Sequence, residues 1–543
     1  MAPDHSLPPY IDTVIIGSGP SALILSYILH GNFLYYDPTT PHPDPLLHAK
    51  LKKAPKLLDI DIGYLTEHFA ASRLSYSTQS LPVNVLLDTL LRPLADTVYE
   101  EIHSCVQWQP HPKKAVPHVV LGDTSRAGGQ WTGNPVAASW DIGALSYAEM
   151  LSLPSYTFAE HHQKTTGKPL AQFTRPTRRE VADYFATYPQ YVGIEGSIYT
   201  SIEVEGISRT SKGFYIRSHN IHCKHLVLAS GIFSHLIAPR PLLQPLLALP
   251  SQSSFASPPL LVVGSGFTAA DIILSTPPHQ KIIHIFKWAP DVRPSPLRAC
   301  HQHAYPEYAG VYRRMKLAAL NSGGTRIVTS PLMRRRSNPF FNQRDWEAVY
   351  EGFPNTAIVA VSVDGSIGSV SLQLENGMIT TRQVSGMRYA IGRRGSLQYL
   401  DEDLRAEVLS SPSYESGSES VDANSISAKT LRAKAEATTE VARNVFITGS
   451  LTGDSLVRFA FGGCVYAAGK IIARTATNEI AAVAQTVPQH STSNALNDAS
   501  QGSTEHFDRF FDAGTITNGH TQLRLDRRKE AHSIDLQHAT VQA

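Results

Sequence analysis

The sequence predicts an α/β fold with two dinucleotide-binding, Rossmann-like domains, the first split by the second, and a disordered C-terminal tail. The main observation is a glycine turn that occurs twice, as GSGPSA at residues 17–22 and as GSGFTA at residues 264–269. Each copy follows an apolar strand and precedes a helix. One such turn is weak evidence, since glycines gather at many tight turns. Two of them, each with its strand, indicate two dinucleotides bound side by side.

Composition sets the limits of the prediction. The chain has 543 residues, enough for two to four domains, and its 42% hydrophobic and 17% charged content is typical of a globular protein. A net charge of +2 gives no reason to expect nucleic acid. The four cysteines form no CxxC pair, so neither a disulfide framework nor a metal site is predicted. We found no signal peptide and no apolar run near the roughly 20 residues of a transmembrane helix, and we expect an intracellular, cytoplasmic protein.

The first glycine turn follows a predicted strand at residues 11–16. Gly17 allows the backbone to turn sharply out of the strand, and Gly19 allows it to approach a pyrophosphate without a Cβ in the way. The helix that begins near Pro20 directs its N–H groups at the phosphates. Ala22 is small enough for that helix to pack on the strand.

An acidic residue follows the next predicted strand, residues 33–36, which ends at Asp37. This is the spacing of about 20 residues at which a carboxylate accepts hydrogen bonds from ribose hydroxyls. A carboxylate would repel a 2′-phosphate, so the first site suits FAD or NAD rather than NADP. The same reasoning predicts a parallel strand–helix–strand unit over residues 11–37.

The second glycine turn repeats this geometry with Gly264, Gly266 and Ala269. The strand that follows it, residues 281–286, ends in a basic residue instead of an acid. The basic residues after this strand are Lys287, Arg293 and Arg298. Positive charge at a strand tip favours a 2′-phosphate, and therefore NADP over NAD. The alternative is that Lys287 is only a solvated strand end.

The remaining chain supplies further elements. Residues 38–60, rich in Pro and His, read as a surface excursion, and residues 410–426 as an exposed loop. We predict a helix over 81–94, strands over 116–121, 226–231, 387–392 and 445–449, and a helix from about residue 463. The predicted domains are 10–237 for the first part of the FAD-binding domain, 258–395 for the NAD(P)-binding domain, 396–480 for the second FAD part, and 485–543 for the tail.

The tail is rich in Ser, Thr, Asn and Gln, with few large apolar groups to offset its ordering entropy. It contains one island, Phe507–Asp512, that could dock on a protein partner. A tail without a specific role is the interpretation we favour.

Several blocks together indicate a family. They are PLL at 45–47, GYL at 63–65, VLLDTLLRP at 85–93, PHVVLG at 117–122, GGQW at 128–131, YPEY at 305–308 and TGDSLVRF at 452–459. In this order they resemble the oxidative-stress-induced growth inhibitor family, which is related to flavin-containing monooxygenases and ornithine N-hydroxylases. The resemblance extends from about residue 10 to residue 475.

The resemblance implies FAD bound by the two ends of the chain and an NADP domain inserted between them. Gly129, Gln130 and Trp131 match the GGxW element beside the flavin in such relatives, where an indole can cover the ring system. The alternative is a core tryptophan in a tight turn. Gly453 and Asp454 resemble the segment that meets the ribityl chain, with capping or loop bonding as the alternative for Asp454.

One monooxygenase signature, FxGxxxHxxxW, is only partly present. Gly231 and His235 fit its middle, while Ala229 replaces the Phe and Pro239 replaces the Trp. His235 is therefore expected to be structural, and no catalytic residue is assigned.

The resemblance implies an FAD-dependent, NADPH-reduced monooxygenase. Its substrates would be O₂ and a small N- or S-containing nucleophile, oxygenated through a flavin C4a-(hydro)peroxide. The alternative is a growth- or stress-regulatory protein that retains the flavin-binding fold without turnover. A thiol–disulfide reductase is disfavoured, because no cysteine precedes Cys105.

Overall fold

The computed structural model describes residues 7–486, apart from 73, 75, 78, 94–102, 135–137, 250–256, 323–343 and 411–424. Most of the predicted exposed loop and nearly all of the predicted tail, including Phe507–Asp512, lie outside these residues. Among the helices described, none is both long and apolar enough to cross a bilayer.

The first sheet combines strands from both ends of the described chain, in the order β18-β19-β8-β1-β4-β5. β1 pairs in parallel with β4 on one side and with β8 on the other, and β19 pairs in parallel with β8. The strands are β1 (Tyr10–Ile16), β4 (His118–Leu121), β5 (Ile198–Tyr199), β6 (Ile207–Thr210), β7 (Gly213–Ile216), β8 (Ile221–Leu228), β18 (Glu440–Ala442) and β19 (Val445–Ile447). β6 and β7 extend the sheet from β8 as antiparallel strands.

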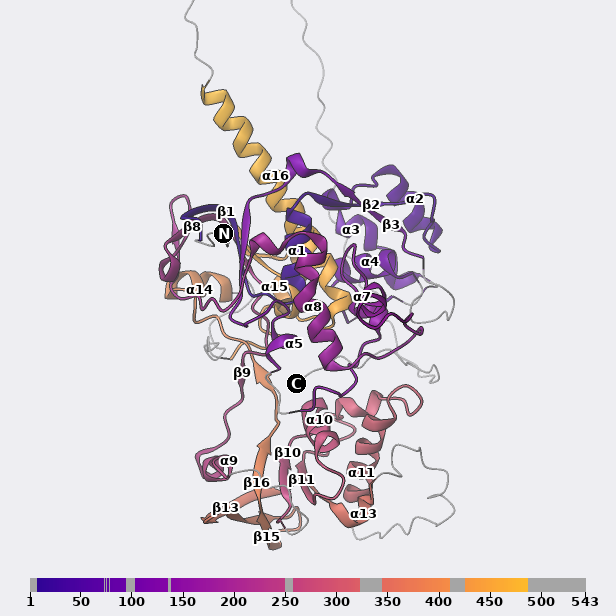
Figure 1. Cartoon of the computed structure of the whole chain (residues 1–543), viewed down its shortest axis with the longest axis vertical. Helices are drawn as coiled ribbons and strands as arrows, with labels where there is room; N and C mark the ends of the chain where they lie inside the picture. Colours follow the sequence, from indigo (N-terminus) through magenta and orange to yellow (C-terminus); the bar gives the residue numbers. More distant parts are fainter. Residues whose placement is uncertain are drawn as a thin grey trace, which may run out of the picture. The chain divides into compact units, whose positions relative to one another are not determined.

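The helices that belong with this sheet come from the same two parts of the chain (Figure 1). α1 is buried along almost its whole length, and its apolar side chains join the core formed by β1 and β8. The helices are α1 (Pro20–Leu29), α2 (Pro45–Lys53), α3 (Ile62–Thr66), α4 (Pro82–Leu91), α5 (Gln130–Gly133), α6 (Ala148–Leu151), α7 (Phe158–Thr166), α8 (Arg178–Val192), α14 (Glu402–Leu409), α15 (Arg432–Ala437) and α16 (Ala460–Thr486).

The second sheet is formed by the middle of the chain, in the order β12-β11-β10-β16, with all strands parallel. Alternate residues of β10 face opposite layers: Leu260 and Val262 pack in the core with α10, and Leu261 packs with the antiparallel sheet β13-β14-β15. The elements are β10 (Leu260–Val263), β11 (Ile282–Phe286), β12 (Tyr350–Pro354), β13 (Ala357–Asp364), β14 (Ile367–Gln373), β15 (Ile379–Val384), β16 (Gly386–Tyr389), α9 (Gln244–Leu247), α10 (Phe267–Ser275), α11 (Pro306–Ser322) and α13 (Trp346–Val349).

The chain enters and leaves this second set of elements through two short strands that pair with each other. β9 (His235–Leu236) and β17 (Arg393–Arg394) are antiparallel, and β17 follows β16 directly in the chain. The predicted fold class is therefore confirmed: one parallel α/β sheet is interrupted in sequence by another.

The predicted parallel unit over residues 11–37 is wrong in one respect. β2 (Asn32–Tyr36) does not join the sheet of β1; it forms a separate antiparallel pair with β3 (Val106–Pro110). The place beside β1 that was predicted for β2 is taken by β4, which comes later in the chain and pairs with β1 in parallel. Local sequence indicated a strand correctly but could not show which strand it would pair with.

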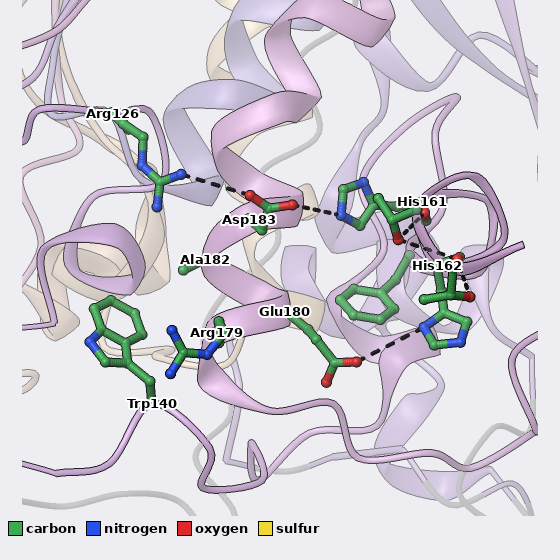
Figure 2. A pocket seen from close by; sticks show the side chains of 11 residues that line it. Arg126, Trp140, His161, His162, Arg179, Glu180, Ala182 and Asp183 are labelled. Atoms are coloured by element: carbon green, nitrogen blue, oxygen red, sulfur yellow. Dashed lines mark hydrogen bonds and ion pairs between the residues drawn. The ribbon is translucent and has the colours of Figure 1, made fainter.

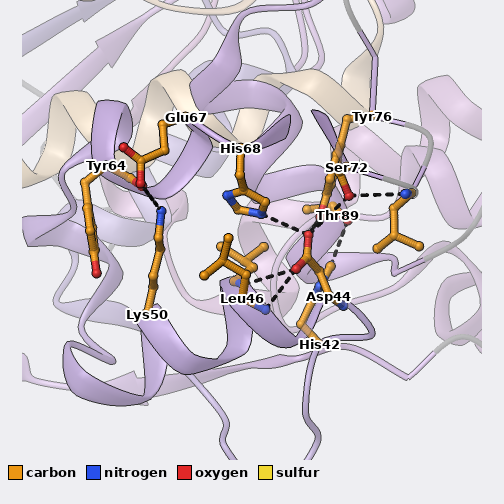
Figure 3. Close-up of polar contacts among 12 residues, drawn as sticks. His42, Asp44, Leu46, Lys50, Tyr64, Glu67, His68, Ser72, Tyr76 and Thr89 are labelled. Carbon is orange, nitrogen blue, oxygen red and sulfur yellow. Dashed lines mark hydrogen bonds and ion pairs between the residues drawn. The ribbon is translucent and has the colours of Figure 1, made fainter. Parts of the chain in front are cut away.

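The predicted surface excursion at 38–60 is instead a packed segment. α2 buries Leu47 and Leu51, and Leu57 is buried in the following turn. The buried Asp44 caps α2: one carboxylate oxygen accepts from the backbone of Leu46, and the other accepts from His68 Nε2 and Tyr76 Oη at 2.9 Å each (Figure 3). The Pro- and His-rich composition of this segment led us to predict a surface loop, although the segment contains a helix that is packed against the core.

Candidate functional site

The first glycine turn is set by contacts that allow only glycine at position 17. Gly17 has φ +105°, and a Cβ there would lie 2.5 Å from the carbonyl oxygen of Ala229, just beyond β8. Its N–H donates to the carbonyl of Leu121 at 2.7 Å. The turn is thereby fixed between the ends of β8 and β4.

Gly19 lies where a ligand can approach. It is the N-cap of α1 with φ −73°, no side chain caps the helix there, and a Cβ built on it meets nothing within 4 Å. The helix N-terminus therefore faces open space, as a pyrophosphate site requires. Ala22 is fully buried on the first turn of α1.

The GGxW element covers this turn from one side. The N–H of Gly128 donates to the carbonyl of Ser18 at 2.8 Å, and a Cβ on Gly129 would lie 3.1 Å from Gly19 Cα. Gln130 is exposed, and Trp131 is half-buried with its ring edge against Phe185 at 5.8 Å. The structure thus brings the two predicted glycine elements together. The Trp131 indole packs against Phe185, as the alternative of a core tryptophan predicted. Part of the indole is nevertheless exposed.

The second glycine turn reproduces the first. Gly264 has φ +146°, and a Cβ there would lie 2.2 Å from the carbonyl oxygen of Ala390, just beyond β16. Gly266 is the N-cap of α10, and a Cβ on it meets nothing within 4 Å. The N–H of Gly264 donates to the carbonyl of Ile285 at 2.9 Å, as that of Gly17 does to Leu121. Ala269 is buried in α10.

His284 forms a hydrogen bond with the second glycine turn, a role that the sequence analysis did not predict. Its Nε2 lies 2.6 Å from the carbonyl oxygen of Gly264, and its Nδ1 lies 2.8 Å from Tyr350 Oη. Complete burial lowers the pKa of His284 to about 4, so the ring is neutral. We infer that Nε2–H donates to Gly264 and that Nδ1 accepts from Tyr350. A histidine in an otherwise apolar strand was the available signal.

The strand register identifies the residue that corresponds to Lys287 in the first site. Ile16 pairs with Leu121 as Val263 pairs with Ile285. Two residues beyond each partner, the equivalent positions are Asp123 and Lys287. Both side chains are exposed, one next to each glycine turn.

The expectation for Asp37 needs correction for this reason. It rested on the preceding strand being the parallel neighbour of β1, and that place belongs to β4. The Asp37 carboxylate accepts from the N–H and the hydroxyl of Thr39 at 2.9 and 2.6 Å, and these bonds lower its pKa. By strand register, Asp123 takes the place beside β1 that Asp37 was expected to take.

The loop after β11 is tied to the second glycine turn. Ser295 Oγ donates to the carbonyl of Ser265 at 2.6 Å, and Arg298 donates to the carbonyl of Pro290 at 2.8 Å. Arg293 is exposed on the same loop. Of the three basic residues, Arg298 therefore shapes the loop, which leaves Lys287 and Arg293 as the candidates for a phosphate contact.

Asp454 is engaged by neighbouring elements. One carboxylate oxygen accepts from the N–H of Leu81 and from Asn84 Nδ2 at 2.9 and 2.7 Å, and the other pairs with Arg432 at 2.6 Å. Gly453, at φ +98°, turns the chain beside Arg432. These contacts favour loop bonding, the alternative considered for Asp454.

The start of α16 packs closely against α4. A Cβ on Gly462 would lie 2.2 Å from the carbonyl oxygen of Val83, and the N–H of Gly463 donates to Asn84 Oδ1 at 2.9 Å. One N–H of the first turn of α16 is thus bonded to a side chain, whereas no side chain caps α1 or α10.

The sequence and the structure were compared with those of known proteins. No family model matches it. Oxidative stress-induced growth inhibitor 1 of Homo sapiens is 29% identical over 386 residues, covering 63% of this chain and 76% of that protein. The Mus musculus protein of the same name is 26% identical over 508 residues, covering 85% and 95%. The chain is thus similar to the oxidative stress-induced growth inhibitors over most of its length. The resemblance predicted from the sequence blocks is confirmed.

Among solved structures, the chain is similar to a flavin-containing monooxygenase from Stenotrophomonas maltophilia, with 15% identity and a TM-score of 0.44 over 86% of this chain and 99% of that one. It is also similar to the reduced form of ornithine hydroxylase from Pseudomonas aeruginosa, with 13% identity and a TM-score of 0.43 over 86% and 100%.

Proposed function

We propose that this relative of the growth inhibitors is an FAD-dependent, NADPH-reduced oxidoreductase, and specifically a monooxygenase of a small nitrogen- or sulfur-containing nucleophile. The observation that carries the proposal is the repeated turn with opposite charges at equivalent positions. Asp123 follows one turn and Lys287 follows the other. A carboxylate suits an unphosphorylated ribose and an ammonium suits a 2′-phosphate.

The residues present fit both cofactors. FAD would be held by Gly17, Gly19 and Gly129, with Asp123 at the ribose and the N-terminus of α1 at the pyrophosphate. When bound, the two cofactors supply hydride transfer and oxygen activation. The chain would hold the two rings in contact and keep water away from them.

NADPH would be held by the corresponding residues of the second turn, Gly264 and Gly266. Lys287 and Arg293 would contact its 2′-phosphate. His284 would keep the turn in shape, because its hydrogen bond fixes the carbonyl of Gly264.

A regulatory protein without turnover is the second candidate. The departures from the monooxygenase signature at Ala229 and Pro239 favour it, and so do the names of the relatives, which describe growth inhibition. The two candidates differ in one property. A regulator that keeps only the fold binds FAD but does not bring the nicotinamide ring against it.

The deciding experiment mixes the purified flavoprotein with NADPH without oxygen. An enzyme loses its oxidised-flavin absorbance and regains it when air is admitted. As a matched control, a Gly266→Val variant keeps its flavin and is not reduced, because its nucleotide site is blocked. Flavin that stays oxidised in wild-type protein saturated with NADPH would refute the enzymatic proposal and favour the regulator.

A further inference from the structure

A cavity of about 340 Å³ lies beside α7 and α8 (Figure 2). Its apolar wall includes Phe158, Ala182 and the half-buried Trp140. Ligand pockets in proteins typically have volumes of about 300–1,000 Å³, so this one suits a small molecule. We call it the α7–α8 pocket.

The charges of the α7–α8 pocket are balanced and sorted. Arg179 lies beside Trp140, with Arg126 on the same side. Glu180 is directed toward His162 on the opposite side, and Asp183 lies between Arg126 and His161 (Figure 2). A purely anionic ligand would meet two carboxylates, and a purely cationic one would meet two guanidinium groups. The lining therefore favours a ligand that carries both charges.

The two arginines have weak partners within the protein. Arg126 Nη1 lies 3.7 Å from Asp183 Oδ1, and these side chains are 54% and 49% exposed. Arg179 Nε lies 3.2 Å from Asp141 Oδ1, with 63% and 72% exposed. Exposed pairs of this kind contribute little stability, so a ligand can replace them at small cost.

The acidic side of the pocket is held in place. Glu180 accepts from the N–H and the hydroxyl of Thr177, both at 2.8 Å, and so caps α8. Asp183 lies 3.4 Å from Nε2 of His161, a ring that is only 4% exposed. Burial lowers the pKa of His161, so the ring is neutral at neutral pH and leaves the negative charge of Asp183 available.

We propose that the α7–α8 pocket binds a small zwitterion, with an ammonium group, a carboxylate and an apolar side chain, as in a free apolar α-amino acid. The ligand carboxylate lies toward Arg126 and Arg179, its ammonium group lies toward Asp183 and Glu180, and its side chain covers Trp140. This inference stands apart from the proposed redox function, because no residue of the glycine turns takes part.

Calorimetry on the full-length protein with three matched probes tests the proposal. L-phenylalanine carries both charges, 3-phenylpropionate lacks the ammonium group and 2-phenylethylamine lacks the carboxylate. We expect L-phenylalanine to bind at least tenfold more tightly than either of the others, since each loses a charge-assisted contact. Equal binding of all three, or no saturable binding of L-phenylalanine, overturns the proposal.

Two variants locate the binding. Arg179→Gln and Asp183→Asn should each weaken L-phenylalanine binding about tenfold or more, because each removes one charge from an exposed side chain. Arg443→Gln, at an exposed arginine that does not line the pocket, should leave binding unchanged. Unaltered binding in both pocket variants places the ligand elsewhere and overturns the proposal. Flavin content should be the same in all three proteins, which separates this result from the fate of the redox proposal.

Discussion

Gly19 and Gly266 occupy the same backbone position in the two repeats, and the space around them makes a clean test possible. Neither has φ in the left-handed region, and a Cβ on either meets no atom within 4 Å. We therefore expect Gly19→Val to fold with a melting temperature close to that of wild type but to purify without flavin, because the side chain fills the pyrophosphate site. Absorbance spectra and thermal melting measure both properties.

Gly17 provides the contrast. A side chain there collides with the carbonyl of Ala229 and needs a strained φ of +105°, so Gly17→Val should lose stability as well as flavin. A Gly19→Val protein that retains full flavin would remove the first turn from the cofactor assignment.

Lys287 sets the expected choice of nucleotide. A charge-assisted hydrogen bond to a 2′-phosphate contributes roughly 1.5–3 kcal/mol, so Lys287→Ala should weaken NADPH binding tenfold or more. NADH binding should change little. Lys281→Ala, an exposed lysine just before the other end of β11, serves as the matched control. Fluorescence titration with both nucleotides gives the comparison, and equal losses for NADPH and NADH in Lys287→Ala would mean that this ammonium does not contact the phosphate.

At the scale of elements, the glycine turns could be predicted because their signals are local. A strand, two glycines and a helix start lie within a dozen residues. The neighbour of β1 could not be predicted in the same way. β2 had the correct spacing and ended near an acid, yet its hydrogen bonds go to β3, which is remote in the sequence. The signal for β4 as the neighbour of β1 was its position in the sequence, a few residues before the GGxW element.

The strand register predicts different roles for Asp123 and Asp37. Asp123→Ala should weaken FAD binding tenfold or more, because a carboxylate that accepts ribose hydroxyl bonds is lost. Asp37→Ala should leave FAD affinity near the wild-type value, since this carboxylate bonds to Thr39. Reconstitution of the apoprotein with FAD gives both dissociation constants. The reverse order would restore Asp37 to the site.

The role of Asp454 shows a second limit of the sequence. Its partners are Leu81 and Asn84, at the start of α4, and Arg432 of α15, and these two helices are far apart in the chain. Nothing near Asp454 in the sequence announces them. A motif match can therefore identify a segment correctly while a long-range network decides what its carboxylate does.

For the whole molecule, the interrupted order of the sheets followed from the sequence, because a second turn between early and late apolar strands allows few other arrangements. Burial was less visible. Three histidines, His42, His118 and His284, are almost entirely buried, and burial lowers the pKa of each to about 4 from an ordinary 6.5. Each stays neutral in the folded protein at a pH at which it would be protonated in the unfolded chain.

These histidines make folding pH-dependent in a defined window. Because their folded pKa values are depressed, each takes up a proton on unfolding between pH 6.5 and about 4, so stability is present above this window and is lost as the pH falls through it. Each should contribute about 1.4 kcal/mol per pH unit to the slope of the unfolding free energy. Asp271 acts in the opposite direction, because burial raises its pKa.

The contribution of one histidine can be isolated by difference. The His118 ring forms hydrogen bonds with the carbonyl of Val116 and the hydroxyl of Ser26. A glutamine amide at this position can form the same two hydrogen bonds. In urea unfolding across the window, His118→Gln should show a slope lower than that of wild type by about one proton, or about 1.4 kcal/mol per pH unit. Parallel pH profiles for His118→Gln and wild type would show that His118 is not held neutral by the fold, and the reasoning for the other two histidines would fall with it.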